Sequence, residues 1–252
     1  REVALLWHLW RLFRRERPAL VHGFTIKCAV YGSLAARLAG VPGRVSAVTG
    51  LGYVFTSDDA KARWLRPLVR GLMRLALGGK RARLILQNPD DVTLFERARL
   101  VDPQDIRLIP GSGVDCVRFA PRADAHTIAL GQPLRVLLPA RLLWDKGLAE
   151  FVDAAHRLRA QGRTLEFLLA GTPDPGNPAA APETMVQGWV DEGVLQWLGH
   201  VDDMPALFRS VDMVVLPSYR EGLPKGLIEA AACGLPLVTT DVPGCREVVT
   251  DG

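Results

Sequence analysis

The sequence has few of the residues that mark disulfide-linked, metal-binding or nucleic-acid-binding proteins. Its four cysteines form neither a Cys-x-x-Cys pair nor a metal-ligand spacing, so we expect reduced thiols in a cytoplasmic protein. Aromatic residues make up only 7% of the chain, and no stacking motif, zinc pattern or recognition helix accompanies them. The composition therefore argues against a disulfide scaffold, a metal centre and a nucleic-acid partner.

Long apolar segments are also missing. No stretch is long and uncharged enough for a transmembrane helix, and residues 1–7 lack the apolar segment and cleavage site of a secretory signal. The chain does not begin with Met, so we expect a fragment of a longer protein. No expected strand precedes a Gly-x-Gly-x-x-Gly segment, which disfavours a nicotinamide dehydrogenase, and no Ser-His-Asp set has a suggestive spacing.

Apolar strand-like runs and helical patterns alternate along the whole chain. Apolar residues make up 48% of the 252 residues, which is enough for a substantial core. The expected strands are residues 19–22, 44–48, 83–86, 106–109, 134–138, 164–169, 195–198, 213–216 and 235–239. This alternation predicts an α/β protein with parallel sheets in two Rossmann-like domains. We expect a partial first domain at 1–118, a linker at 119–133 and a truncated second domain at 134–252.

Charge divides the chain in the same way. Residues 1–120 contain 20 Lys and Arg against 10 Asp and Glu, whereas residues 121–252 contain 11 against 17. Such an asymmetry suggests two domains that face different partners.

Residues 218–230 place two carboxylates across a strand-to-helix turn. Glu221 and Glu229 lie eight residues apart, slightly more than two helical turns, so both can face one crevice. Gly222 permits close approach of a ligand to the backbone, and Pro224 suits the start of a helix. The free backbone N–H groups at the start of that helix can bind a phosphate or a polar sugar. A surface helix with two incidental acids would show the same spacing.

A second polar turn follows the expected strand at 134–138. Arg141 and Lys146 lie in this turn, which leads into a helix. Ligands of parallel sheets bind beyond the carboxyl ends of the strands, where Arg141, Gly171, Gly199, Glu221 and Asp241 all fall. Solvated loop cations are the plainer explanation for Arg141 and Lys146.

Together these segments resemble the Glu-x7-Glu and Arg-x4-Lys elements of family 4 glycosyltransferases, which are retaining enzymes of the GT-B architecture. The resemblance implies two Rossmann-like domains facing a cleft, both incomplete here, and no essential metal or other cofactor. It implies that Arg141 and Lys146 bind the donor diphosphate, that Glu221 lies by the donor sugar and that Glu229 holds the ribose hydroxyls. The remaining expected donor contacts are Gly199, His200, Gly222 and Leu223.

The first half supplies the expected acceptor side. Its candidate residues at strand ends are His22, Lys27, Thr49 and Gly50. The stretch around Thr49 is similar to that of members that extend undecaprenyl-diphosphate-linked sugars, although Thr49-Gly50 departs from the His-Gly of the wider family. For His22, a hydrogen-bonded histidine at a strand end is an equal alternative.

A basic helix is expected at residues 59–77. Its arginines, among them Arg66 and Arg70, form one stripe, while Leu65, Leu68, Leu72, Leu75 and Ala76 occupy the opposite face. Eight cations and no acid lie between residues 61 and 83. Such a helix can rest on an anionic membrane surface, although a solvated basic face is the commoner case.

We therefore expect a hexosyltransferase that moves a sugar from a nucleotide donor, a UDP-hexose or UDP-N-acetylhexosamine, to a lipid-linked saccharide in surface polysaccharide or glycan biosynthesis. Its expected location is cytoplasmic, peripheral on the inner face of the cell membrane. The alternative is a non-catalytic sugar-nucleotide-binding or assembly module of the same fold.

Overall fold

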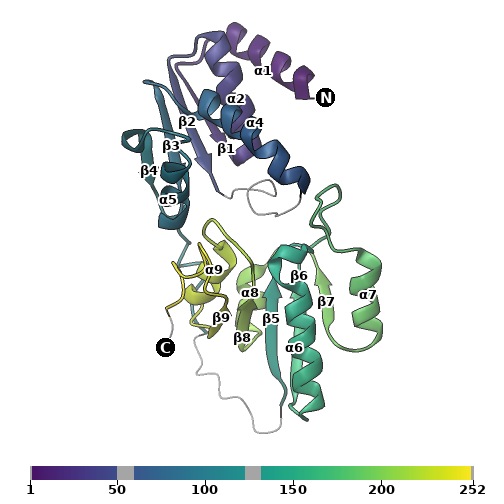
Figure 1. Cartoon of the computed structure of the whole chain (residues 1–252). Coiled ribbons are helices and arrows are strands. Elements are labelled where there is room, and N and C mark those ends of the chain that lie inside the picture. Colours follow the sequence, from purple (N-terminus) through teal and green to yellow (C-terminus); the bar gives the residue numbers. More distant parts are fainter. Residues whose placement is uncertain (1, 50–59, 123–131, 251–252) are drawn as a thin grey trace. The chain divides into compact units, whose positions relative to one another are not determined.

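The computed structural model describes residues 2–49, 60–122 and 132–250, with only the backbone described at 60–66. The chain divides into two compact units, Arg1–Ser112 and Gly113–Gly252 (Figure 1). Each has its own parallel sheet, which confirms the predicted α/β fold class. The linker limits at 119 and 133 stay a prediction, because residues 123–131 lie outside the described part.

The first unit contains a sheet in the order β1-β2-β3-β4, with every described pair parallel. Its strands are β1 Leu20–Phe24, β2 Gly43–Val48, β3 Ala82–Leu86 and β4 Ile106–Leu108. Its helices are α1 Glu2–Glu16, α2 Ile26–Ala39, α4 Ala60–Leu77 and α5 Pro89–Arg97, with a 3-10 turn at Pro103–Asp105. The core is formed by β2, β3, α4 and α5 side chains such as Val48, Leu84, Met73 and Phe95.

Helix α1 lies along α2 and contributes no buried residue (Figure 1). Strand β1 is paired on one side only among the described strands, and its residues alternate between exposed and half-buried. The chain turns tightly from β1 into α2. The approach is so close that a Cβ on Gly23 would lie 3.0 Å from the Ala29 Cα. This edge of the unit is therefore more open than the β2-β3 centre.

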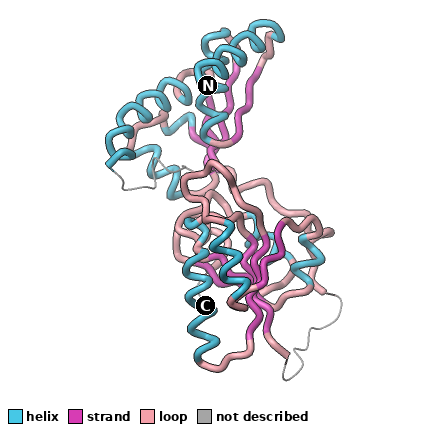
Figure 2. The backbone as a smooth tube through the Cα atoms, turned by 90° about the vertical axis from the view of Figure 1, so that its right-hand side faces the viewer, coloured by secondary structure: helices cyan, strands magenta, loops and turns pink. Residues whose placement is uncertain are grey.

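The second unit contains a five-stranded parallel sheet in the order β7-β6-β5-β8-β9. Its strands are β5 Leu134–Pro139, β6 Leu165–Ala170, β7 Gln196–Gly199, β8 Met213–Leu216 and β9 Leu237–Thr239. Its helices are α6 Leu148–Ala160, α7 Glu183–Asp191, α8 Met204–Arg209 and α9 Lys225–Ala232, with a 3-10 turn at Trp144–Lys146. Figure 2 shows these helices on both sides of the strands. All nine predicted strands are confirmed, with limits that differ by at most two residues at either end.

The strand order of the second unit creates a switch point beside β5. The chain passes from β5 outward to β6 and β7, then returns to place β8 on the other side of β5. Loops after β5 and β8 therefore leave the same sheet edge in opposite directions, and ligands of such sheets bind at a switch point of this kind. Both predicted motifs follow these two strands.

Candidate active site

Lys146 and Glu221 meet at the switch point of the second unit. Lys146 comes from the turn after β5 and Glu221 from the loop after β8, and the Lys146 Nζ donates to the Glu221 Oε1 at 2.6 Å. Their side chains are only 17% and 13% exposed. Burying two ions costs hydration free energy, and their attraction offsets this cost only when the geometry is good. A buried ion pair is therefore weak evidence for a contribution to stability. A role in binding explains its position better.

Gly147 allows the Lys146 turn to pack against the end of β8. Its φ is +77°, and a Cβ there would lie 2.2 Å from the Pro217 carbonyl oxygen. The Ser218 hydroxyl and the Tyr219 N–H both donate to the Asp145 carbonyl at 2.9 Å. The two loops that hold Lys146 and Glu221 are thus joined through backbone groups.

A third loop, after β9, holds Glu221 from its other side. The Glu221 N–H donates to the Pro243 carbonyl at 3.1 Å. A Cβ on Gly244 would lie 2.5 Å from the Glu221 carbonyl oxygen, so only glycine allows this approach. The Thr240 hydroxyl also donates to the Ser218 carbonyl. Glu221 is consequently fixed by contacts from two neighbouring strand ends.

Arg141 forms a separate ion pair at the same sheet edge. Its Nη1 donates to the Asp174 Oδ2 at 2.5 Å, and Asp174 belongs to the loop after β6. The Arg141 side chain is 58% exposed, which leaves donors of its guanidinium available to a ligand. Both predicted diphosphate-binding cations therefore pair with carboxylates in the structure.

Glu229 is buried in α9 and pairs with Lys225 one turn earlier. The Lys225 Nζ lies 3.3 Å from the Glu229 Oε1, and the two side chains are 68% and 12% exposed. Helix α9 starts directly after Pro224, as the sequence predicts. The preceding residues Gly222 and Leu223 are buried and half-buried.

Gly199 ends β7 and His200 follows it, on the outer side of β6. Gly199 has a φ of +65° and open space where a Cβ would be. Its carbonyl accepts the Gly171 N–H at 2.8 Å, which joins the ends of β6 and β7. The exposed His200 ring lies 3.1 Å from the Asp202 carboxylate. An exposed imidazole on a fixed strand end is free to reach a planar ligand.

Two further groups beside the switch point have raised pKa values. The hydroxyl of Tyr219 donates to Glu150, and this bond raises the pKa of Tyr219. Burial raises the pKa of the Cys245 thiol, which is inaccessible to solvent. Both groups therefore stay protonated at neutral pH, and neither is a candidate nucleophile.

The predicted acceptor-side residues in the first unit lie on its surface. His22 is expected at a strand end but lies in the middle of β1, where it is exposed with its ring centroid 4.2 Å from that of Phe24. Lys27 donates to Glu2 at 2.9 Å, and this bond raises the pKa of Lys27. Thr49 is exposed after β2, while Gly50 lies outside the described residues.

Helix α4 exposes most of the described part of its predicted apolar face. Ala76 of that face is buried together with Met73 and Leu77, whereas Leu68, Leu72 and Leu75 are 62%, 41% and 49% exposed. The apolar residues recur with helical spacing on two flanks, and the sheet and α2 cover only one of them. This helix therefore presents leucines as well as arginines to solvent.

The arginines of α4 also differ from one another. Arg70 is exposed, but the Arg74 guanidinium donates to the carbonyls of Ala98 and Arg99 at 3.0 and 2.7 Å. Arg74, which is also exposed, thus satisfies carbonyls just beyond the end of α5 as well as facing solvent. The side chain of Arg66 lies outside the described part of the chain.

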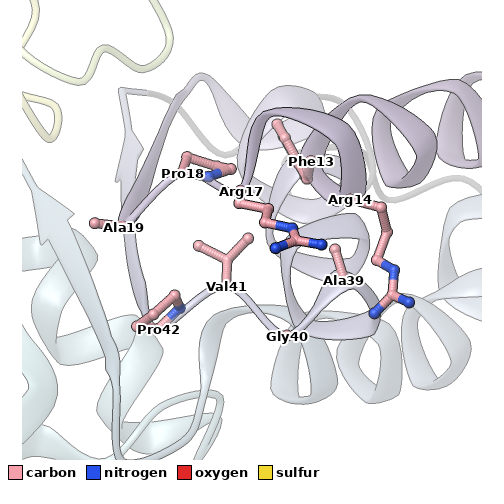
Figure 3. A pocket seen from close by; sticks show the side chains of 9 residues that line it. All are labelled: Phe13, Arg14, Arg17, Pro18, Ala19, Ala39, Gly40, Val41 and Pro42. Atoms are coloured by element: carbon pink, nitrogen blue, oxygen red, sulfur yellow. The ribbon is translucent and has the colours of Figure 1, made fainter.

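Two pockets of the first unit lie away from the predicted residues. One, of about 510 Å³, is lined by Arg14 and Arg17 at the end of α1 and by residues that precede β1 and β2 (Figure 3). The other, of about 630 Å³, is lined by residues that precede β3 and β4. Both lie at the amino ends of the strands, opposite the edge where parallel sheets bind ligands.

The described residues contain no group of three or more His, Cys, Asp and Glu side chains that could hold a metal ion. Among the same residues, no helix is both long and apolar enough to cross a membrane.

Family models match both units. The model of glycosyl transferases group 1 matches residues 133–252, and that of glycosyl transferase 4-like proteins matches residues 1–88. The chain thus carries a glycosyl transferases group 1 domain and a glycosyl transferase 4-like domain. The predicted family resemblance is confirmed.

Two curated glycosyltransferases are similar along almost all of the chain. N,N'-diacetylbacillosaminyl-diphospho-undecaprenol alpha-1,3-N-acetylgalactosaminyltransferase of Campylobacter jejuni is 29% identical, over 97% of this chain and 65% of its own length. UDP-Gal:alpha-D-GlcNAc-diphosphoundecaprenol alpha-1,3-galactosyltransferase of Escherichia coli is 28% identical, over 97% and 63%. The chain thus spans just under two thirds of these relatives.

Solved glycosyltransferase structures share the fold. HepE of Anabaena, in complex with UDP and glucose, has a TM-score of 0.77 at 19% identity, over 98% of this chain and 65% of that one. Sucrose-phosphate synthase from Thermosynechococcus elongatus has a TM-score of 0.75 at 22% identity, over 97% and 61%. These neighbours confirm the predicted GT-B fold class.

Sequence reasoning missed the carboxylate that pairs with Arg141. Asp174 lies in the segment Thr172 to Pro178, which is rich in turn-forming residues and directly follows a strand at the ligand edge. Polar loop residues at such an edge are often functional, so the sequence of this segment could have indicated Asp174 as a candidate site residue. The contact itself depends on how the loops after β5 and β6 pack.

Proposed function

We propose that the protein transfers a sugar from a UDP-hexose or UDP-N-acetylhexosamine to a lipid-linked saccharide in surface polysaccharide or glycan biosynthesis. The main support is the Lys146–Glu221 pair at the β5/β8 switch point of a chain from this family. The names of the two curated relatives describe transfer to sugars on diphospho-undecaprenol. The HepE structure was solved in complex with UDP and glucose.

The reaction breaks the bond between the sugar and a nucleoside diphosphate, and negative charge grows on the departing diphosphate. Fixed cations stabilise that charge most in the transition state, which is where stabilisation accelerates the reaction. Lys146 has donors left beyond the one that Glu221 accepts, and Arg141 has donors beyond the one that Asp174 accepts. We assign both cations to the diphosphate.

The two glutamates receive different roles. Glu221, fixed at the switch point, orients the donor sugar through its hydroxyls, while the buried Glu229 accepts the ribose hydroxyls. The Gly199 and His200 turn contacts the base. The anomeric configuration of the sugar is retained, as the family resemblance implies.

The same cations make a metal ion unnecessary in this proposal. Arg141 and Lys146 supply two positive charges where a divalent ion would otherwise neutralise the diphosphate. Transfer that continues at full rate in excess EDTA supports this assignment. Loss of transfer in EDTA that magnesium restores would contradict it.

The acceptor side and the membrane surface are assigned to the first unit. His22 lies within β1, Lys27 follows that strand, and Thr49 directly follows β2, with Gly50 next in the sequence. Helix α4 exposes Arg70 and, on another face, leucines. A helix with basic and apolar exposed residues binds the headgroup region of anionic membranes. This placement brings a lipid-linked acceptor to a peripheral protein on the cytoplasmic face.

The decisive experiment compares nucleotide binding and sugar transfer. Glu229→Ala removes charge-assisted hydrogen bonds of roughly 1.5–3 kcal/mol each, so UDP affinity measured by calorimetry is expected to fall roughly 10- to 150-fold per lost bond. Glu183→Ala, an exposed glutamate of α7, is the matched control and keeps wild-type affinity. Equal UDP affinity in Glu229→Ala and wild type would remove the ribose assignment.

Transfer is measured in the complete protein with radiolabelled UDP-sugars and an N-acetylglucosaminyl-diphosphoundecaprenol acceptor. Incorporation of label into the lipid fraction supports the enzyme. UDP-sugar binding without transfer to any acceptor of this class would favour the non-catalytic module.

A further inference from the structure

The loop after β6 presents a carboxylate that is oriented from two sides. The Asp174 Oδ2 accepts from Arg141 Nη1 at 2.5 Å and from the Asn177 Nδ2 at 3.1 Å. The Asn177 Oδ1 in turn accepts the Ala179 N–H at 3.0 Å, which fixes the amide. The Asn177 amide therefore fixes the orientation of the Asp174 carboxylate, and this carboxylate fixes the orientation of the Arg141 guanidinium.

The backbone segments that hold Arg141 and Asp174 are locked to each other. Their hydrogen bonds run from Leu142 N to Thr172 O at 3.1 Å, from Trp144 N to Ala179 O at 2.8 Å and from Ala181 N to Leu142 O at 2.9 Å. A Cβ on Gly171 would lie 1.8 Å from the Ala140 carbonyl oxygen, so the two segments approach as closely as glycine permits. The distance between the two side chains is thus set by a rigid frame.

The Arg141–Asp174 pair contributes little to stability. Its side chains are 58% and 31% exposed, and ion pairs in such surroundings are typically worth less than about 1 kcal/mol. An arginine exposed to this degree would otherwise sample many rotamers, and ordering it upon ligand binding costs free energy. A carboxylate that already holds one guanidinium nitrogen removes much of that cost.

We propose that Asp174, oriented by Asn177, is a positioning residue that holds the Arg141 guanidinium ready for the donor diphosphate. The proposal rests on the proposed function, because it requires Arg141 to face that diphosphate. Asp174 acts through Arg141 alone and touches no reacting atom. Its effect therefore depends on the presence of Arg141.

The test is a double-mutant cycle on steady-state transfer in the complete protein. Asp174→Asn keeps the shape of the side chain and is expected to lower kcat roughly three- to tenfold, the cost of ordering one long side chain, with a smaller change in the KM for the UDP-sugar. Asp174→Glu restores part of the loss. In an Arg141→Ala background, Asp174→Asn is expected to change kcat less than twofold, because the residue that it positions is gone.

A second variant removes the support and leaves the Asp174 carboxylate in place, with a second carboxylate beside it. Asn177→Asp preserves the acceptor for the Ala179 N–H but loses the donor to Asp174, so it should lower kcat in wild type and not in Arg141→Ala. This variant decides the question if Asp174→Asn proves unstable in thermal unfolding. The matched control is Asp153→Asn, which breaks an exposed Asp–Arg pair in α6 and should leave kcat unchanged.

The outcomes separate this inference from the proposed function. A large kcat loss in Arg141→Ala with wild-type kcat in Asp174→Asn and Asn177→Asp overturns the positioning role only. Equal losses in both Arg141 backgrounds indicate a merely structural residue and also overturn it. Wild-type kcat in Arg141→Ala overturns the diphosphate assignment itself, and the positioning role with it.

Discussion

In the first unit the described strands cross the sheet in chain order, β1-β2-β3-β4, whereas in the second unit the chain returns to the middle of the sheet to give β7-β6-β5-β8-β9. The return separates the loops after β5 and β8 and creates the switch point at which ligands of such sheets bind. The buried Lys146–Glu221 pair lies there. The described strands of the first unit have no such point, and the polar residues His22, within β1, and Thr49, after β2, are exposed.

Charge follows the same division. The first 120 residues are strongly basic and the remainder is acidic, yet the second unit holds the two cations assigned to the donor. Those two cations are each paired with a carboxylate, while α4 carries several cations along one helix, of which Arg70 and Arg74 are exposed. The difference indicates that specific anion binding depends on where the topology places one or two side chains, and that a basic surface depends on how many there are.

The sharpest test of this difference removes the fixed cations. Arg141→Ala or Lys146→Ala is expected to lower turnover roughly a hundred- to a thousandfold, the cost of losing one preorganised group that stabilises developing charge. Arg141→Lys should rescue only in part, because an ammonium lacks the two-pronged geometry of a guanidinium. The measurement is steady-state transfer of radiolabelled sugar in the complete protein.

The control for this pair of variants is a fold check by circular dichroism. Added magnesium should not restore their activity if the side chains themselves neutralise the diphosphate. A folded Arg141→Ala, Lys146→Ala double variant with wild-type turnover would sink the diphosphate assignment.

The next test concerns the packing beneath the switch point. Gly147→Ala forces an L residue into a left-handed conformation and drives a Cβ to within 2.2 Å of Pro217 O, so we expect roughly 2–4 kcal/mol of destabilisation. Gly162→Ala is the matched control, since its φ is +71° but nothing lies within 4 Å of the added carbon. It should cost about 1–2 kcal/mol. Equal unfolding midpoints in urea for the two variants would show that the close approach to β8 is not tight.

The sequence predicted every strand because each one is a short apolar run buried in a parallel sheet, and it predicted the start of α9 from Pro224. It could not predict that Lys146 meets Glu221, 75 residues later, because that contact depends on strand order. Nor could it choose the buried flank of α4, since Leu68 and Met73 both fit helical periodicity. The sequence did not indicate Asp174 because its contact with Arg141 depends on how the loops after β5 and β6 pack. Local sequence patterns were sufficient to predict the helices and strands. The contacts between these elements could be known only from the folded structure.

The smallest expected effect tests the basic surface of the first unit. Arg66→Glu with Arg70→Glu should weaken binding to phosphatidylserine-containing vesicles by about 1 kcal/mol for each cation lost, and more for the reversal. Leu68→Ser with Leu72→Ser should weaken it as well, because these leucines are exposed and add apolar contact with the headgroup region. Vesicle co-sedimentation measures both effects.

The comparison between the units supplies the control for this last test. Arg157→Glu with Arg163→Glu makes the same charge change at exposed positions of the second unit and should leave vesicle binding nearly unchanged. If binding depended on net charge alone, the two double reversals would weaken it equally. Raising salt should weaken wild-type binding, since exposed charges are screened beyond about 8 Å at physiological ionic strength. Co-sedimentation that is insensitive to salt, to Arg70 and to the leucines would make α4 an ordinary solvated helix, and the basic character of the first unit would then need another partner.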